Sequence, residues 1–183
     1  MTHNRYSKTL ITGGSRSGKS TYALTLADYF ERKVFLATAR ALDEEMKARI
    51  AKHQQERDHT YHTIEEPIDL AKTIDSTGRS QDVILVDCLT VWLGNLQLEL
   101  SPETMQTKIE ALLEILEKPP CHLIFVTNEV GMGIVPEHKL ARDFRDQAGL
   151  LNQRMANLVD RVVLVVSGIP LEIKNNLKQG SMP

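Results

Sequence analysis

A phosphate-binding loop is predicted by residues 9–21, which read Thr9-Leu10-Ile11-Thr12-Gly13-Gly14-Ser15-Arg16-Ser17-Gly18-Lys19-Ser20-Thr21. The loop fits the pattern G-x-x-x-x-G-K-[ST], in which a glycine opens the turn and Gly-Lys-Ser closes it. A short apolar strand precedes the loop, and a helix-forming run over 21–30 follows it. Because strand, motif and helix occur in this order, we favour a phosphate loop over an ordinary strand–turn–helix corner whose glycines serve only the turn.

The residue types of this loop suit nucleotide binding. Glycines allow backbone N–H groups to turn inward around phosphate oxygens, and the start of the helix adds its positive dipole end. Lys19 is the predicted catalytic cation at the outer phosphates, and Ser20 is a predicted ligand of the Mg²⁺ between them. The predicted nucleotide-binding residues of the loop are Gly13, Gly14, Ser15, Arg16, Ser17, Gly18, Lys19 and Ser20.

Length and composition predict one globular domain over residues 1–183, with flexible ends at 1–8 and 175–183. Hydrophobic residues make up 42% of the chain and charged residues 25%, and the net charge is −2 without a basic run. This balance argues against a nucleic-acid partner or an anionic membrane surface, and no apolar run reaches transmembrane length. The two cysteines, Cys88 and Cys121, are expected to be reduced and buried, as in a cytoplasmic protein.

Short apolar runs alternate with helical patterns along the chain. The expected strands are 9–12, 34–38, 83–87, 123–127 and 162–166, and the expected helices are 21–30, 43–57, 68–78, 101–118 and 140–154. The strands are apolar throughout, so both faces of the sheet should be covered. We therefore predict an α/β fold with a mostly parallel sheet, helices on both faces, and ligands at the carboxyl ends of the strands.

An aspartate, Asp87, ends the apolar run 83–87. A carboxylate at the end of a nearby strand is the usual partner of a phosphate loop, where it holds Mg²⁺ directly or through water. Many buried strands also end in Asp at a simple turn. With the phosphate loop present in the same chain, we favour the metal-binding interpretation.

A histidine, His53, shares one face of a predicted helix with Leu42, Met46 and Ile50. A histidine on an apolar stripe is more often a hydrogen-bonded core residue than a chemical group. Flanking arginines could neutralise a phosphate, so spacing alone leaves both interpretations open.

The segment 127–136 contains two glycines and a proline, which indicate a loop with special backbone geometry. Asn128 and Glu129 either face a substrate or form a structural turn, and the sequence does not separate these alternatives. In the next helical run, Arg142 and Arg145 either bind an anionic ligand or pair with neighbouring aspartates in solvent.

Several of these stretches together resemble one family. They are GGSRSGKS at 13–20, ATARALDEEMKARIAKH at 37–53, EEP at 65–67, VDCLTVWLGN at 86–95 and TNEVGMGIVPEHKLARDFRDQAGLLNQ at 127–153. The resemblance runs from Leu10 to about Gly168. It is to the bifunctional adenosylcobinamide kinase / adenosylcobinamide-phosphate guanylyltransferase family of cobalamin biosynthesis.

The resemblance implies a P-loop fold of the RecA-like kind, assembled as a homotrimer. It implies that ATP or GTP phosphorylates adenosylcobinamide, and that GMP from GTP then passes through a GMP-histidine to adenosylcobinamide phosphate. The family's nucleophile falls on His53. Beyond the loop, its nucleotide-contacting positions fall on Ala37, Thr38, Ala39, Gln54, Gln55, Glu56, Arg57, Glu65 and Asp87.

Two other functions fit parts of the same sequence. A simpler small-molecule kinase would need the loop and Asp87 but no covalent step at His53. A non-catalytic nucleotide-binding switch would bind nucleotide without consuming it. A GMP label on His53 would distinguish the bifunctional enzyme from both.

Overall fold

The computed structural model describes residues 6–40 and 60–177, and they form one seven-stranded sheet in the order β3-β2-β4-β5-β1-β6-β7. All neighbouring strands are parallel except β6 and β7, which are antiparallel. The strands are β1 (Lys8–Thr12), β2 (Lys33–Ala37), β3 (Tyr61–Glu65), β4 (Val83–Asp87), β5 (His122–Val126), β6 (Arg161–Val166) and β7 (Ile169–Asn175).

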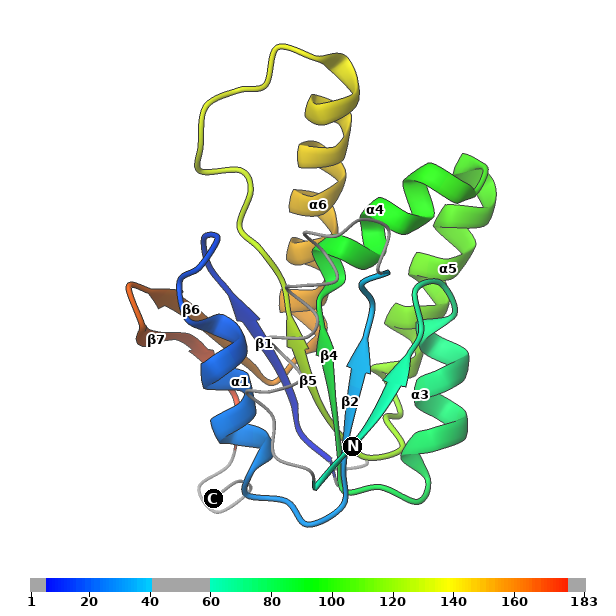
Figure 1. The fold of residues 1–183 in the computed structure, drawn as a ribbon, viewed down its shortest axis with the longest axis vertical. Coiled ribbons are helices and arrows are strands. Elements are labelled where there is room, and N and C mark those ends of the chain that lie inside the picture. Colours follow the sequence, from blue (N-terminus) through cyan, green and yellow to red (C-terminus); the bar gives the residue numbers. More distant parts are fainter. Residues whose placement is uncertain (1–5, 41–59, 178–183) are drawn as a thin grey trace.

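Helices cover both faces of this sheet (Figure 1). They are α1 (Lys19–Ala27), α3 (Leu70–Gly78), α4 (Leu89–Glu99), α5 (Pro102–Ile115) and α6 (Lys139–Leu158). Leu10 joins the apolar cluster of α3, α4, α5 and α6, whereas its neighbour Ile11 joins the cluster of α1. Successive residues of a strand point to opposite faces, so a strand buried on both faces must be apolar throughout.

The five strands predicted from apolar runs are confirmed to within one residue at either end. Two further strands and one helix were not predicted, namely β3, β7 and α4. β3 and β7 are edge strands whose residues are mostly exposed, so neither is a continuous apolar run. The helix α4 is apolar on several sides and therefore lacks the one-sided stripe that indicates a surface helix.

Helix α5 begins at the residues that the sequence predicts for a helix start. The hydroxyl oxygen of Ser101 accepts a hydrogen bond from the backbone N–H of Thr104, and Pro102 occupies the first helical position. The predicted stripe is buried as expected, with Met105, Ile109 and Leu112 facing the other helices of the same layer.

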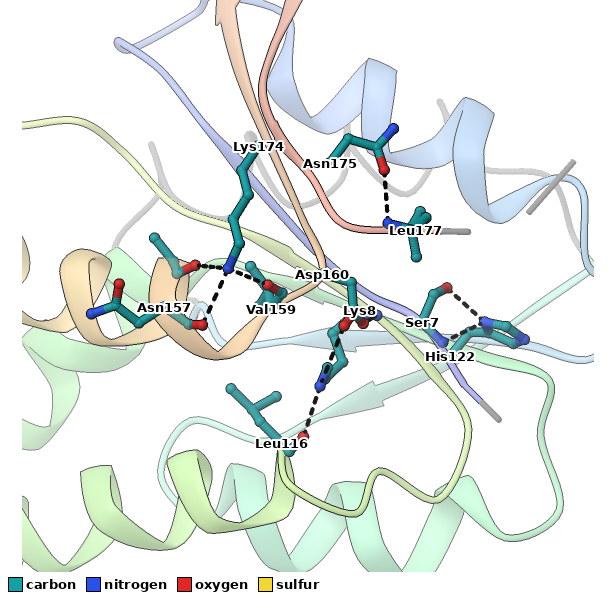
Figure 2. Close-up of polar contacts among 11 residues, drawn as sticks. Ser7, Lys8, Leu116, His122, Asn157, Val159, Asp160, Lys174, Asn175 and Leu177 are labelled. Carbon is teal, nitrogen blue, oxygen red and sulfur yellow. Dashed lines mark hydrogen bonds and ion pairs between the residues drawn. The ribbon is translucent and has the colours of Figure 1, made fainter. Parts of the chain in front are cut away.

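The predicted flexible ends need correction where the structure describes them. At the amino end, Ser7 and Lys8 are buried, and Lys8 is the first residue of β1. At the carboxyl end, β7 extends to Asn175. Figure 2 shows the contacts that fix this amino-terminal edge of the sheet. His122 lies against Ser7, and the Nζ atom of Lys174 donates to three carbonyl oxygens at the end of α6, those of Ala156, Asn157 and Val159. No helix within residues 6–40 and 60–177 is long and apolar enough to cross a bilayer.

Candidate nucleotide-binding site

The phosphate loop lies between β1 and α1, at the carboxyl edge of the sheet (Figure 1). Gly18 caps α1 with a φ of 96°, and Gly13 has a φ of 149°. A Cβ atom added to Gly13 would lie 2.3 Å from the carbonyl oxygen of Val165 on β6. Gly13 and Gly18 therefore occupy backbone positions that a larger residue would strain. Such positions favour a phosphate loop over an ordinary surface turn.

The predicted cation, Lys19, is folded back into the loop. Its side chain is buried, with the residue 6% exposed, and Nζ donates to the carbonyl oxygen of Gly14 at 2.5 Å. Burial lowers the pKa of Lys19 below its ordinary value, while nearby Cys88 and Asp87 oppose that shift. A bound polyphosphate would offer this ammonium group several negatively charged acceptors in place of one neutral carbonyl.

Asp87 ends β4 and lies in the same sheet row as Ala37 of β2 and Val126 of β5. β4 and β1 both lie beside β5, and the negative charge of Asp87 opposes the lowering of the Lys19 pKa. Ser20 lies in the first turn of α1, directly after the loop. The Ser20 hydroxyl and the Asp87 carboxylate are therefore candidate oxygen ligands at this end of the sheet. These hard oxygen ligands are the type that Mg²⁺ binds together with substrate phosphates. Within the described residues there is no group of three or more His, Cys, Asp or Glu side chains that could hold a metal by themselves.

The row continues to Glu65, which pairs with Ala37 at the end of β3. Next to Ala37, Thr38 is fully buried, and its hydroxyl group donates to the carbonyl oxygen of Cys88 and accepts from the Cys88 N–H. Asn95 of α4 donates to the carbonyl oxygen of Thr38 at 2.9 Å. The predicted nucleotide-contacting residues of this part of the chain thus lie at the same end of the sheet as the loop, namely Ala37, Thr38, Ala39, Glu65 and Asp87. The hydrogen bonds of Thr38 to Cys88 and Asn95 explain this residue as part of the folded framework.

A second network fixes the end of β5. The hydroxyl group of Thr127 donates to Oδ1 of Asn152 on α6 at 2.8 Å, and Nδ2 of Asn152 donates to the carbonyl oxygen of Asn128. The backbone N–H of Asn128 donates to Oγ1 of Thr90 on α4 at 2.7 Å. Sequence reasoning missed Thr90 and Asn152, because isolated polar residues within helices carry no pattern that points to a partner far along the chain.

The connection from β5 to α6 is also tied to the phosphate loop. Glu129 donates its backbone N–H to the carbonyl oxygen of Gly13 at 3.0 Å, and its carboxylate accepts the N–H of Gly131. These contacts give Glu129 a turn-forming role and leave a role at a substrate untested. Arg142 donates to the carbonyl oxygens of Pro136 and Glu137, whereas Asp143 pairs with Lys139. Neither an anion site nor a pair with Asp143 is therefore needed to explain Arg142.

Both cysteines have free thiols, as expected, although only Cys121 is fully buried. Burial raises the pKa of each thiol to about 12, so neither is a nucleophile near neutral pH.

His53 and the nucleotide-contacting positions Gln54, Gln55, Glu56 and Arg57 lie outside the described residues.

Comparison of the sequence with known proteins shows the family of this chain. The family model described as cobinamide kinase / cobinamide phosphate guanyltransferase matches residues 9–173. The chain belongs to this family. Similar members are named bifunctional adenosylcobalamin biosynthesis proteins. The one from Pseudomonas aeruginosa is 45% identical over 166 residues, covering 90% of this chain and 96% of the relative. Those from Escherichia coli and Salmonella typhimurium are 38% and 40% identical over 178 residues, each covering 90% of this chain and 98% of the relative.

Solved structures with little sequence likeness share the fold of this cobinamide kinase / guanyltransferase family member. An ATPase from a bacterial type III secretion system is 9% identical with a TM-score of 0.59, covering 96% of this chain and 60% of that one. A Pyrococcus horikoshii protein is 7% identical with a TM-score of 0.56, covering 96% and 89% of the two chains. The expected α/β P-loop fold of the RecA-like kind is confirmed.

Proposed function

We propose that this chain phosphorylates adenosylcobinamide with ATP or GTP, and then transfers GMP from GTP to the resulting phosphate. The products of the second reaction are adenosylcobinamide-GDP and pyrophosphate. The observation that supports the proposal is the family match over 9–173, on a chain whose phosphate loop, Lys19 and Asp87 lie at the carboxyl end of the sheet. A homotrimer in the cytoplasm remains our expectation, and sedimentation equilibrium measures its size.

The kinase step needs positioned positive charge more than covalent chemistry. The hydroxyl oxygen of the acceptor attacks the γ-phosphorus, the bond to the β-phosphate oxygen breaks, and the nucleoside diphosphate leaves. Lys19 and the backbone N–H groups of the loop hold the outer phosphates, and a phosphate oxygen replaces the carbonyl oxygen of Gly14 as the acceptor of the Lys19 ammonium group. Mg²⁺ bound by Ser20 and Asp87 would neutralise charge on the bridging oxygens.

The guanylyl transfer is proposed to run through His53. A neutral imidazole nitrogen attacks the α-phosphorus of GTP, forming a P–N bond as the bond to pyrophosphate breaks. An oxygen of adenosylcobinamide phosphate then attacks the same phosphorus and releases the histidine. Imidazole has an ordinary pKa of about 6.5, so much of it is unprotonated at neutral pH. We assign nucleotide contacts to 37–39, 54–57 and Glu65 for both steps.

A labelling experiment tests this assignment. The protein is incubated with Mg²⁺ and GTP labelled at the α-phosphate, with and without adenosylcobinamide phosphate. We expect an acid-labile, alkali-stable label on the protein that the acceptor removes and that H53N lacks. H62N is the matched control, because His62 lies exposed on β3 and should leave the label unchanged. Kinase activity without any label would instead favour the simpler kinase, and binding without turnover would favour a nucleotide-binding switch.

A further inference from the structure

We propose that the corrinoid acceptor docks on the apolar tip of the segment 128–138, which connects β5 to α6 and is called here the β5–α6 arm. The proposal rests on the proposed function, and it assigns the acceptor a surface that the nucleotide does not use. The arm projects beyond the carboxyl edge of the sheet, on the side where the phosphate loop lies (Figure 1).

The arm exposes large apolar side chains. Met132 is 81% exposed, Ile134 is 96% exposed and Val135 is 60% exposed. Leu140, in the first turn of α6, is 62% exposed and continues the same segment. Single exposed apolar residues are common, but four within nine positions indicate a surface that a partner covers.

Polar contacts hold this apolar segment at both ends. At its start, Asn128 and Glu129 donate their backbone N–H groups to Thr90 and Gly13, and Gly131 donates to the carboxylate of Glu129. At its end, Arg142 donates to the carbonyl oxygens of Pro136 and Glu137. Both ends of the arm are therefore held by hydrogen bonds, and the exposed apolar residues lie between these two fixed ends.

The occupant follows from position and chemistry. The triphosphate of ATP or GTP is bound through charge and hydrogen bonds. The side chains of Met132, Ile134 and Val135 have no groups for such contacts. The acceptor must bring a hydroxyl group to the γ-phosphate, and a corrinoid offers the methyl groups of a large macrocycle as apolar contact surface beside its amide side chains. The hydrogen bond from Glu129 to Gly13 joins the base of the arm to the phosphate loop, so a macrocycle held on the arm can extend its hydroxyl-bearing side chain along the arm toward the loop. This continuity favours the acceptor over a second copy of the chain.

The test measures corrinoid binding directly, by equilibrium dialysis of cobinamide against the full-length protein with a non-hydrolysable ATP analogue present. The variants are I134S and the double variant M132S/I134S. We expect cobinamide affinity to fall about tenfold in the first and further in the second, because buried apolar area is lost. Affinity for the ATP analogue should not change. L98S is the matched control, because Leu98 is 76% exposed at the end of α4, outside the arm.

Two results would overturn the proposal. One is unchanged cobinamide affinity in the double variant. The other is a fall in molecular mass by sedimentation equilibrium together with lost binding, which would make the arm a contact between copies. Dialysis needs no turnover, so a parent protein that binds cobinamide through the arm without phosphorylating it would sink the proposed function and leave the docking surface standing.

Discussion

The backbone N–H of Glu129 donates a 3.0 Å hydrogen bond to the carbonyl oxygen of Gly13. This one contact joins the end of β5 to the first glycine of the phosphate loop. The loop that would hold the nucleotide and the base of the arm that we assign to the acceptor are therefore joined by a backbone hydrogen bond, and a change in the backbone of one should reach the other.

Asn152 should be the side chain that most stabilises the arm's base. It accepts from Thr127 and donates to the carbonyl oxygen of Asn128, in a partly buried position. N152A removes both hydrogen bonds and leaves the Thr127 hydroxyl group only its 3.3 Å contact with Oγ1 of Thr90, so we expect the free energy of unfolding to fall by about 1–3 kcal/mol. Urea denaturation measures this change. N157A is the control, because Asn157 is exposed on the same helix, and equal losses in the two variants would contradict the argument.

The phosphate loop offers a pair of glycines with opposite expectations. A Cβ atom on Gly13 would meet the Val165 carbonyl oxygen at 2.3 Å, at a φ of 149°, whereas one on Gly14 would meet nothing within 4 Å. We expect G13A to lose about 1–3 kcal/mol of stability from backbone strain and to weaken nucleotide binding. G14A should stay within about 0.5 kcal/mol of the parent protein. If urea denaturation and nucleotide titration cannot tell the two variants apart, the described loop geometry is wrong.

Lys19 should matter for transfer far more than for folding. Its ammonium group is the buried cation of the cradle, so K19M removes the charge that would stabilise the transferred phosphoryl group. We expect the kinase rate to fall by at least about 100-fold, with little change in the circular dichroism spectrum. K139M removes an exposed cation that pairs with Asp143 and should retain full activity. A K19M protein with near-normal phosphorylation of adenosylcobinamide would exclude the proposed role.

The sequence predicted the strands that are buried on both faces, because their residues are apolar. It did not predict the two exposed edge strands. The runs at β1, β2, β4, β5 and β6 are apolar because helices cover both of their faces. β3 and β7 lie at the two edges, where exposed residues are polar or alternate. One local signal for β7 was present: Ser167-Gly168 is a two-residue turn, and both of its residues have positive φ.

The site was predictable to the extent that its chemistry is local. The phosphate motif is contiguous, and Asp87 ends a recognisable strand, so both were found from pattern. Thr90 and Asn152 support the same edge through contacts 38 and 24 residues away in sequence, and no periodicity encodes such pairs. The covalent role of His53 came from resemblance to the family, because spacing alone fits a core histidine better than a chemical group.

His122 should make stability depend on pH. Its Nδ1 accepts the backbone N–H of Ser7 at 3.1 Å and lies 2.8 Å from the Ser7 hydroxyl oxygen, so the folded state favours the neutral ring (Figure 2). Burial lowers the pKa of His122, and the charge of Asp82 opposes this only in part. The unfolded chain therefore binds the proton more readily, and stability should be complete above the ordinary pKa of about 6.5 and decrease as the pH falls below it.

The measurement is the urea midpoint between pH 7.5 and 5.5 for the parent protein and for H122N. The asparagine oxygen can accept the Ser7 N–H but does not titrate, so H122N should lose less stability than the parent protein as the pH is lowered. H62N removes an exposed histidine and should keep the parent's pH dependence. If H122N and the parent protein decline in parallel, the acid sensitivity comes from other groups and His122 is protonated as easily in the folded state as in the unfolded chain.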